Sequence, residues 1–331
     1  MSLARLRLLV SIRRAQNPVF AMTPERFAAA CARHPDVAAR IDPVFVTDED
    51  GLDAALRDAD AILGWRFARD NLAARAPRLR WIQLTGAGAE HLMPLDWLPR
   101  GAAITTASGV HGAKAREFAT MALLMLHTRI PAMATNQQAH RWRQIFTPII
   151  AGRTVLVVGV GAMGRAVVRA ARGLGLQVLG IRRSGRAMAG VHAMGTPDDL
   201  DRFLPQADLV ALTAPATAAT TRLLGAQRLA LIKPGAGLLN MGRAALVDNA
   251  ALIDALESGR LSGAVVDVFD PEPLPAESPL WDAPNLFVVP HCSSDDADIY
   301  AAGVLDLTLD NAARLLAGRA LKNRLRPNRQ Y

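Results

Sequence analysis

The chain has 331 residues, enough for two domains, and its 51% hydrophobic and 21% charged residues are typical of a globular protein and exclude a disordered one. The formal net charge is +8, but only three of the 38 basic residues are Lys, and the arginines are spread along the whole chain. This distribution favours a compositional bias over a nucleic-acid partner, although a net positive field attracts anionic substrates.

The number of cysteines and the length of the apolar runs indicate in which cellular compartment the protein is expected. Cys31 and Cys292 are too few for a disulfide framework and have no metal-ligand spacing, so no metal is expected. Residues 1–14 contain too short an apolar run for a signal peptide and are read as a first strand. No apolar run has the length of a membrane span, and we expect a cytoplasmic protein without a membrane partner.

In the first third of the chain, short β-rich runs alternate with helical ones. The strand patterns cover residues 6–12, 43–47, 61–66, 79–86 and 102–108. The helical patterns cover residues 23–34, 48–58 and 68–77, with Thr23 as N-cap and Pro24 at the first helical position of the first. This alternation predicts a parallel α/β unit. The glycine-rich turn TGAGAEHL ends its fourth strand, where backbone N–H groups can point at an anion.

The rest of the chain repeats this alternation after a long apolar helix, predicted over residues 115–142. A strand from Thr154 leads into a glycine-rich turn and a helix, and further strands are predicted at residues 176–181, 207–214, 235–241, 262–269 and 285–290. The last helical pattern, residues 297–318, has no strand of its own, so we expect it to cross back to the first domain.

The predicted fold is therefore α/β, with two Rossmann-like or flavodoxin-like parallel-sheet domains and a cleft between them. A discontinuous substrate-binding domain is expected to comprise residues 1–108 and 293–331. A dinucleotide-binding domain is expected to comprise residues 109–292.

The turn GVGAMG after the strand from Thr154 predicts a dinucleotide site. Gly159 permits the tight turn, Gly161 lets the chain approach a pyrophosphate, and Gly164 lets the helix lie close to the sheet. Backbone N–H groups of Ala162 and Met163 would carry the phosphate charge at the positive end of the helix.

The residues after the next strand indicate which nicotinamide cofactor is preferred. An NAD site usually has an acid here that bonds the ribose 2′-hydroxyl, whereas this chain has Arg182, Arg183 and Ser184. Two guanidiniums and a hydroxyl can bind a 2′-phosphate through charge-assisted hydrogen bonds. NADP(H) is the predicted cofactor, with NAD(H) possible; the alternative is that both arginines are solvated surface.

Three chemically active side chains come after three later strands in order. Arg243 has the bidentate geometry that holds a carboxylate, and His291 can act as general acid in reduction and base in oxidation. Glu272 beside the histidine would favour the protonated imidazole, although Asp270 is an alternative partner. The competing interpretation of His291 is an ordinary loop histidine.

At these residues the chain resembles the D-isomer-specific 2-hydroxyacid dehydrogenase family over nearly its whole length. The motifs that carry the resemblance, in order, are NMGRAALVDNAALIDAL, DVFDPEPLP and Pro290–His291, with the dinucleotide turn upstream. The resemblance implies Arg243, Glu272 and His291 as the catalytic set, and the branch that the chain most resembles is the glyoxylate/hydroxypyruvate reductases. It also implies a homodimer joined through the cofactor domain.

Further roles are implied by the resemblance, residue by residue. Asp267 matches the acid that contacts the nicotinamide carboxamide, and Pro215 matches the loop along the cofactor. Met241, which with Gly242 stands where Thr-Ala is more usual, is expected to adjust the backbone near the nicotinamide. Ala87 and Gly88 match the backbone amides that hold the substrate carboxylate.

Departures from the family pattern affect the substrate more than the reaction. Ala244 replaces a Gly, and Gly242 replaces an Ala. CSSDD comes after His291, where small apolar residues and Gly are common in the family. Because of this last departure, Cys292, Ser293 and Ser294 could line the pocket. We expect NADPH-preferring reduction of small anionic 2-oxo acids, with glyoxylate and hydroxypyruvate as leading substrates. The alternatives are a dehydrogenase of a larger or phosphorylated D-2-hydroxy acid and a non-catalytic nucleotide-sensing binding protein.

Overall fold

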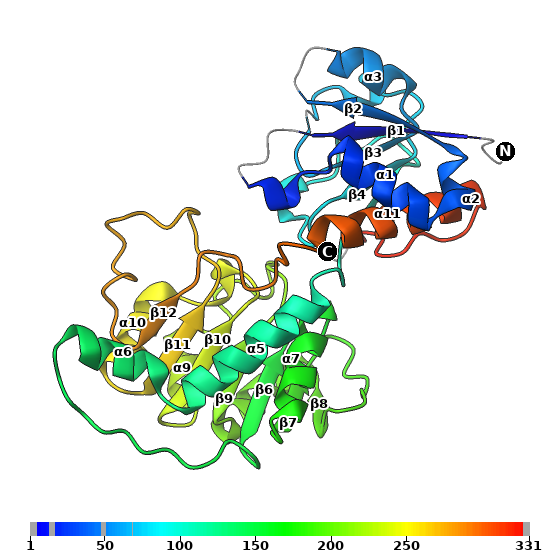
Figure 1. Ribbon diagram of the computed structural model, residues 1–331. Coiled ribbons are helices and arrows are strands. Elements are labelled where there is room, and N and C mark those ends of the chain that lie inside the picture. The colour runs from blue at the N-terminus through cyan, green and yellow to red at the C-terminus, as the bar shows by residue number, and fades with distance from the viewer. Residues whose placement is uncertain (1–4, 13–16, 48–50, 68, 327–331) are drawn as a thin grey trace. The chain divides into compact units, whose positions relative to one another are not determined.

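The computed structural model describes residues 5–12, 17–47, 51–67 and 69–326 (Figure 1). The predictions for residues 1–4, 13–14, 48–50 and 68 therefore lie outside the described residues. The chain forms two compact units: the first unit comprises Met1–Val110 and Asp296–Tyr331, and the second unit comprises His111–Asp295. The predicted boundaries and the separate functions of the two domains stay predictions.

The first unit contains a five-stranded parallel sheet in the order β2-β1-β3-β4-β5. Its strands are β1 (Leu6–Ser11), β2 (Ile41–Val46), β3 (Ala61–Gly64), β4 (Trp81–Leu84) and β5 (Ala103–Thr105). Its helices are α1 (Pro24–Arg33), α2 (Pro35–Ala38), α3 (Leu52–Asp58), α4 (Leu72–Arg75) and α11 (Tyr300–Leu316), with short 3-10 turns η1 (Pro18–Phe20) and η2 (Glu90–Leu92). All residues of β3 and β4 are buried, as expected for a parallel sheet covered on both faces.

Helix α11 is the element of the first unit that is most distant in sequence from its neighbours. Its apolar face joins α1 and the sheet in one core, to which Val304, Leu305 and Leu309 contribute fully buried side chains. The hydroxyl of Tyr300 at its start donates to the backbone oxygen of Thr85, at 2.6 Å. The C-terminal helix thus supports the strand that leads into the turn TGAGAEHL.

The second unit contains a seven-stranded parallel sheet in the order β12-β11-β10-β9-β6-β7-β8. Its strands are β6 (Thr154–Val158), β7 (Gln177–Ile181), β8 (Ala193–Gly195), β9 (Leu209–Leu212), β10 (Ala236–Asn240), β11 (Leu261–Val266) and β12 (Leu286–Val288). Its helices are α5 (Gly112–His127), α6 (Ile130–Gln138), α7 (Ala162–Gly173), α8 (Leu200–Phe203), α9 (Ala226–Leu231) and α10 (Asn249–Glu257), with 3-10 turns η3 (Pro197–Asp199), η4 (Leu204–Gln206) and η5 (Ala244–Leu246). The predicted fold class, two parallel-sheet α/β domains, is confirmed.

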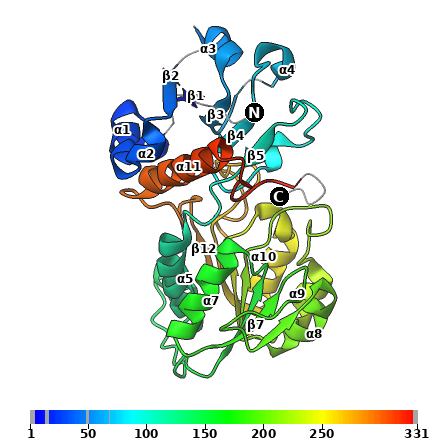
Figure 2. The same ribbon diagram turned by 90° about the vertical axis from the view of Figure 1, so that its right-hand side faces the viewer.

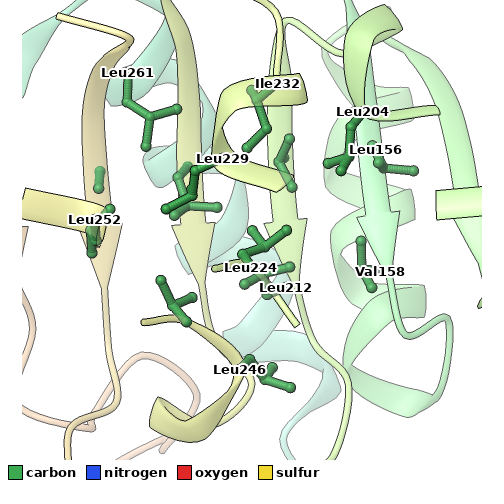
Figure 3. Close-up of a cluster of buried hydrophobic side chains, with 14 of the residues drawn as sticks. Leu156, Val158, Leu204, Leu212, Leu224, Leu229, Ile232, Leu246, Leu252 and Leu261 are labelled. Atoms are coloured by element: carbon green, nitrogen blue, oxygen red, sulfur yellow. The ribbon is translucent and has the colours of Figure 1, made fainter. Parts of the chain in front are cut away.

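Helices cover both faces of this sheet, with α5 and α7 on one side and α8, α9 and α10 on the other (Figure 2). Figure 3 shows side chains of the second of these layers, among them Leu229 and Ile232 from α9 and its end, together with Leu156 and Leu212 of the central strands β6 and β9. All of these side chains are buried. Burying a leucine contributes about 1.5–3 kcal/mol, so this layer holds the central strands firmly in register.

The order of the strands determines where a ligand can bind in the second unit. From β6 the chain first adds β7 and β8 on one side, and then returns to add β9, β10, β11 and β12 on the other. The reversal lies between β6 and β9, and in open α/β sheets ligands bind outside the carboxyl ends of strands at such a switch point.

The long helix predicted before the glycine-rich turn is wrong in extent, and strand β8 was not predicted. The helix expected over residues 115–142 is two helices, because Arg129 takes a left-handed conformation (φ 64°) and Pro131 starts α6. Proline cannot supply the N–H that would continue the preceding helix. Strand β8 is only three residues long and half exposed, which leaves little periodicity to detect.

Within the residues that the structure describes, no helix is both long and apolar enough to cross a membrane.

Candidate active site

The glycine turn lies at the switch point, between the ends of β6 and β9. Gly159 has a φ of 97°, and a Cβ there would lie 2.5 Å from the backbone Cα of Ala214. A Cβ on Gly164 would lie 2.4 Å from the carbonyl oxygen of Gly159, to which the Thr213 hydroxyl also donates at 2.9 Å. Only glycine fits at these two positions, because the helix start, the turn and the end of β9 touch one another.

Gly161 differs from the other two glycines of the turn. A Cβ there would meet no atom within 4 Å, so open space lies beside this residue. Gly161 caps α7, whose first N–H groups, including those of Ala162 and Met163, have no partner within a regular helix. Open space beside the positive end of a helix of this length suits the pyrophosphate of a dinucleotide.

The segment after β7 is a basic turn. The N–H of Gly185 donates to the oxygen of Arg182 at 3.0 Å, and the Ser184 hydroxyl accepts from the N–H of Arg186 at 3.4 Å. The Arg182 residue is half-buried, whereas Arg183 and Ser184 are exposed. Residues 182–186 contain three arginines and no acid, so this turn presents positive charge at the carboxyl end of a strand next to β6.

Arg243 is held by the residue at the end of β10. The buried Asn240 accepts from the N–H of Gly242 at 3.1 Å and donates from Nδ2 to the oxygen of Arg243 at 3.1 Å. The guanidinium of Arg243 donates to the Gly242 oxygen at 2.7 Å. A Cβ on Gly242 would lie 2.9 Å from the oxygen of Ala214, which explains the glycine where an alanine is more usual. Asn240 is the first residue of the motif NMGRAALVDNAALIDAL, but the sequence analysis gave it no role. The signal for that role is an amide at the end of an otherwise apolar strand.

The structure brings His291 and Glu272 together. Nδ1 of His291 lies 2.8 Å from Oε2 of Glu272, and the other carboxylate oxygen, Oε1, accepts from the backbone N–H of Phe269 at 2.9 Å. Because a carboxylate only accepts, Nδ1 carries the ring proton in this pair. Among the described residues no hydrogen bond joins Asp270 to the imidazole. Both side chains of the pair are partly exposed, so they face an accessible space.

Asp267 lies directly after β11 and accepts hydrogen bonds from the segment that follows His291. Its Oδ1 accepts from the backbone N–H groups of Cys292 and Ser293, both at 3.0 Å, and its Oδ2 accepts from the Ser293 hydroxyl at 2.5 Å. Burial raises the pKa of this carboxyl, against the lowering effect of the Ser293 hydrogen bond and the positive charge of His291. Its contact with a nicotinamide stays a prediction.

The sequence left open that the residues after His291 line the pocket, and this stays a prediction; the structure gives contacts for three of them. The Ser293 residue is only 2% exposed and turned into its bond with Asp267. Oδ1 of Asp295 lies 3.3 Å from Nδ1 of His111. Desolvation and the carboxylates of Asp267 and Asp295 raise the pKa of the Cys292 thiol, which disfavours the reactive thiolate.

The loop after β9 is braced by its own hydroxyls. The Thr220 hydroxyl donates to the oxygen of Pro215 at 2.7 Å, and the N–H of Arg222 donates to the oxygen of Ala245 at 2.6 Å. The loop is thereby tied to the turn after Arg243.

Met241 is 4% exposed, so its side chain belongs to the core and only its backbone can face a cofactor.

Ala87 and Gly88 lie in the first unit, just after β4. Ala87 is exposed and Gly88 is half-buried. The preceding Gly86 packs on the indole of Trp65, because a Cβ there would lie 2.3 Å from the ring.

In the described ranges, no cluster of His, Cys, Asp and Glu side chains is arranged to hold a metal ion.

Comparison with known proteins identifies the family. Residues 120–293 match the model of the NAD binding domain of the D-isomer specific 2-hydroxyacid dehydrogenases. The chain belongs to this family. The resemblance expected from the sequence motifs is confirmed, and with it an oxidoreductase that has an NAD(P)-binding Rossmann domain.

Relatives and solved structures agree with this family. The glyoxylate/hydroxypyruvate reductase B of Pectobacterium carotovorum subsp. carotovorum (strain PC1) is 31% identical over 306 residues, which cover 88% of this chain and 95% of that protein. A D-isomer specific 2-hydroxyacid dehydrogenase from Xanthobacter autotrophicus Py2, in complex with NADPH and MES, has a TM-score of 0.85 at 29% identity and covers 99% of this chain and 100% of its own. An NADPH-dependent glyoxylate/hydroxypyruvate reductase from Sinorhizobium meliloti, in complex with NADP and sulfate, has a TM-score of 0.81 at 27% identity and covers 99% of this chain and 100% of its own.

Proposed function

We propose that the protein reduces small 2-oxo acids, with glyoxylate and hydroxypyruvate as leading substrates, to D-2-hydroxy acids, and that it prefers NADPH over NADH. The observation that carries the proposal is the 2.8 Å contact between His291 and Glu272, at the sheet edge where Arg243 comes after a neighbouring strand. The similarity to reductases named for glyoxylate and hydroxypyruvate supports the choice of substrate.

His291 is the proton donor in this mechanism. Since Nδ1 faces Glu272, Nε2 is the nitrogen that can face the carbonyl oxygen of a substrate. The carboxylate of Glu272 stabilises the doubly protonated imidazolium, which gives one proton to that oxygen and becomes neutral. A bound nicotinamide supplies the hydride to the carbonyl carbon, so that hydride and proton together convert the 2-oxo acid to a 2-hydroxy acid.

Arg243 would hold the substrate carboxylate. The fork of a guanidinium matches a carboxylate in two parallel hydrogen bonds and adds positive charge near the polarised carbonyl. Asn240 fixes the backbone on both sides of this arginine. Backbone N–H groups at Ala87 and Gly88 are the proposed carboxylate contacts of the substrate-binding domain.

The basic turn after β7 supports the preference for NADPH. A 2′-phosphate would meet Arg182, Arg183 and Ser184, and no acid within this turn repels it. The glycine turn at Gly159 and Gly161 would hold the pyrophosphate, and Pro215, Met241 and Asp267 would contact the cofactor further along.

A spectrophotometric panel tests the proposal. Purified protein is mixed with NADPH or NADH and with glyoxylate, hydroxypyruvate, pyruvate or 3-phosphohydroxypyruvate, and the absorbance at 340 nm is followed. We expect the largest kcat/KM with NADPH and either glyoxylate or hydroxypyruvate. A larger kcat/KM for the phosphorylated acid would instead assign a phosphorylated D-2-hydroxy acid, and no turnover with any acid would assign a nucleotide-sensing binding protein.

A homodimer joined through the second unit is the proposed assembly. Helices α5 and α6 expose Met121, Leu124, Ile130 and Met133, and the segment after them exposes Trp142, Phe146 and Ile149 at 96%, 86% and 79%. Large apolar side chains gathered on one stretch of a surface mark a protein contact site. A second copy of the chain would bury them.

A further inference from the structure

His291 has a backbone conformation that needs support. Its φ is 49°, in the left-handed region, where a residue with a Cβ is disfavoured. Such a conformation persists only where the surroundings hold it, and at functional sites it often serves to aim a side chain. The direction of the imidazole therefore depends on what anchors the chain on either side of residue 291.

The chain before His291 is anchored by the sheet. Val289 donates its N–H to the oxygen of Val266 at 2.9 Å, and His291 donates its own N–H to the oxygen of Val289 at 2.9 Å. The first bond extends the pairing of β12 with β11 by one residue, and the second closes a tight turn around Pro290. They do not hold the backbone that leaves the histidine.

The chain after His291 is anchored by one buried carboxylate. Asp267 accepts two backbone N–H groups, from Cys292 and Ser293, and the hydroxyl of Ser293. Both Asp267 and Ser293 are 2% exposed. Asp267 is fixed in turn, because it comes directly after β11 and its N–H donates to the oxygen of Asn240 at 3.0 Å. Three donors from two consecutive residues thus converge on a rigid acceptor.

We propose that Ser293 is a positioning residue for His291: its hydroxyl, together with Asp267, clamps the backbone after the histidine and keeps the imidazole against Glu272. The inference deepens the proposed reduction and rests on it, because the imidazole is the proton donor there. Ser293 acts through the backbone of residues 291–293, and not by touching substrate or cofactor.

The hydroxyl of Ser293 has a second effect, on the charge of Asp267. Burial raises the pKa of this carboxyl, and the Ser293 hydroxyl and the two backbone N–H groups oppose that rise. A carboxylate that accepts several hydrogen bonds is stabilised in its charged form. The Ser293 hydroxyl therefore favours the charged form of the carboxylate that it bonds, and an ionised carboxylate has about four acceptor positions in total, three of which the clamp uses.

The decisive variant is Ser293→Ala, with Ser262→Ala as the matched control. Ser262 is also a buried serine of the second unit, 7% exposed, and its hydroxyl donates to the Ala236 oxygen at 3.2 Å, at the start of β11 and far along the strand from its carboxyl end. We expect Ser293→Ala to lower kcat about 10- to 100-fold, the range for a slightly misplaced catalytic group, with the KM for NADPH changed by less than about twofold. Ser262→Ala should keep the kcat of the wild type. Equal kcat values in the two variants would overturn the proposal.

A double-mutant cycle shows whether Ser293 acts through Asp267. If the two form one clamp, Ser293→Ala added to Asp267→Asn lowers kcat by much less than the product of the two single effects. Independent, multiplying effects would show that the serine acts in some other way and would refute the clamp.

Amide hydrogen exchange separates this inference from the proposed function. In the wild type, the peptide that contains Cys292 and Ser293 should exchange slowly, and Ser293→Ala should speed its exchange about tenfold or more while Ser262→Ala leaves it unchanged. A wild type that reduces no 2-oxo acid would refute the proposed function, and the exchange rates would still test the clamp. Unchanged exchange at this peptide in Ser293→Ala would refute the clamp even in an active enzyme.

Discussion

Glu272 is hydrogen-bonded to Nδ1 of His291, which leaves Nε2 as the ring nitrogen for the proposed proton transfer. The same carboxylate is anchored to the backbone N–H of Phe269 through its other oxygen, so it cannot rotate away without losing a second bond. In the proposed reduction, the proton donor would therefore be oriented by its partner as well as stabilised by it. Asp270, two residues earlier, shares the sequence neighbourhood but not this geometry.

Replacing each acid separately distinguishes the two. We expect Glu272→Gln to lower kcat for reduction by about 10²- to 10³-fold, because the amide neither stabilises the imidazolium nor fixes the ring in one tautomer. Asp270→Asn should retain most of the turnover. Steady-state kinetics at neutral pH with saturating NADPH measures both, and the reverse order of effects would make Asp270 the partner.

Arg182 and Arg183 allow a second test at the same scale. In Arg182→Ala/Arg183→Ala the specificity constant for NADPH should fall roughly tenfold or more, since two charge-assisted hydrogen bonds to a phosphate are lost. The value for NADH should change little, because NADH has no 2′-phosphate, and it therefore serves as the internal control. Equal losses with both cofactors would show that the arginines serve the fold rather than the phosphate.

At the scale of elements, the site is built from the segments that leave the carboxyl ends of the strands. Arg243 comes after β10, Asp267 and Glu272 come after β11, and His291 comes after β12, three strands that are neighbours in the sheet. Parallel strands end at the same edge, so residues that are far apart in sequence are gathered there. The turn from β6 into α7 occupies the same edge at the reversal of strand order.

Two glycines of that turn should respond differently to the same methyl group. Gly159→Ala should destabilise the second unit by about 2 kcal/mol or more, from left-handed strain and the contact with Ala214. Gly161→Ala should keep the melting temperature and weaken NADPH binding about tenfold or more, because its Cβ enters only the open space proposed for the pyrophosphate. Thermal unfolding and fluorescence titration measure the two effects, and tight NADPH binding to Gly161→Ala would place the pyrophosphate elsewhere.

Asp208 joins the segments that lead into β6, β9 and β10, at the amino ends of these strands. It predicts a pH dependence of stability. Its carboxylate accepts from the Thr154 N–H at 2.9 Å and from Lys233 at 2.6 Å. Burial alone would raise the pKa of this carboxyl, but these two partners lower it below its usual range. A lowered pKa in the folded state means that the stabilisation is present above the unfolded pKa of about 3.9 and is lost as the pH falls through the folded value.

Asp208→Asn should therefore lower the free energy of unfolding by about 1–2 kcal/mol at pH 7. The difference from the wild type should shrink as the pH falls below about 4, because the wild-type carboxylate is then neutralised as well. Urea unfolding at pH 7 and pH 3 measures it. A difference that stayed constant over this range would mean that the charge of Asp208 contributes nothing.

At the scale of the whole molecule, the fold of a single chain does not bury the exposed apolar side chains around α5 and α6. Trp142 and Phe146 are 96% and 86% exposed, values that a stable soluble surface rarely presents so close together. A second copy that covers them would make the folded state depend on protein concentration.

Charged substitutions on this segment test the assembly. Trp142→Asp/Phe146→Asp should convert a dimer into a monomer, as measured by light scattering during size-exclusion chromatography, because burying two carboxylates in an apolar interface is strongly unfavourable. Ile299→Asp is the control, since this exposed residue lies in the first unit. A wild type that is monomeric at micromolar concentration would refute the homodimer.

Much of this molecule is determined by local sequence patterns. The alternation of β-rich and helical runs predicted both parallel sheets, because it depends on which short segments are apolar and in what period. The glycine turn and the order of Arg243, Glu272 and His291 after three strands indicated the chemistry, because strand ends of a parallel sheet meet at one edge.

Contacts that depend on the register between neighbouring strands were decided only by the tertiary structure. Asp267 and Ser293 are 26 residues apart, and nothing near either of them predicts that one carboxylate holds the backbone after the histidine. The choice of Glu272 over Asp270 as the neighbour of His291, and the left-handed backbone at residue 291, are likewise found only in the structure. Side-chain partners across strands are fixed by where the strands stop and how they are packed, and a pattern that extends over a few residues contains no information about either.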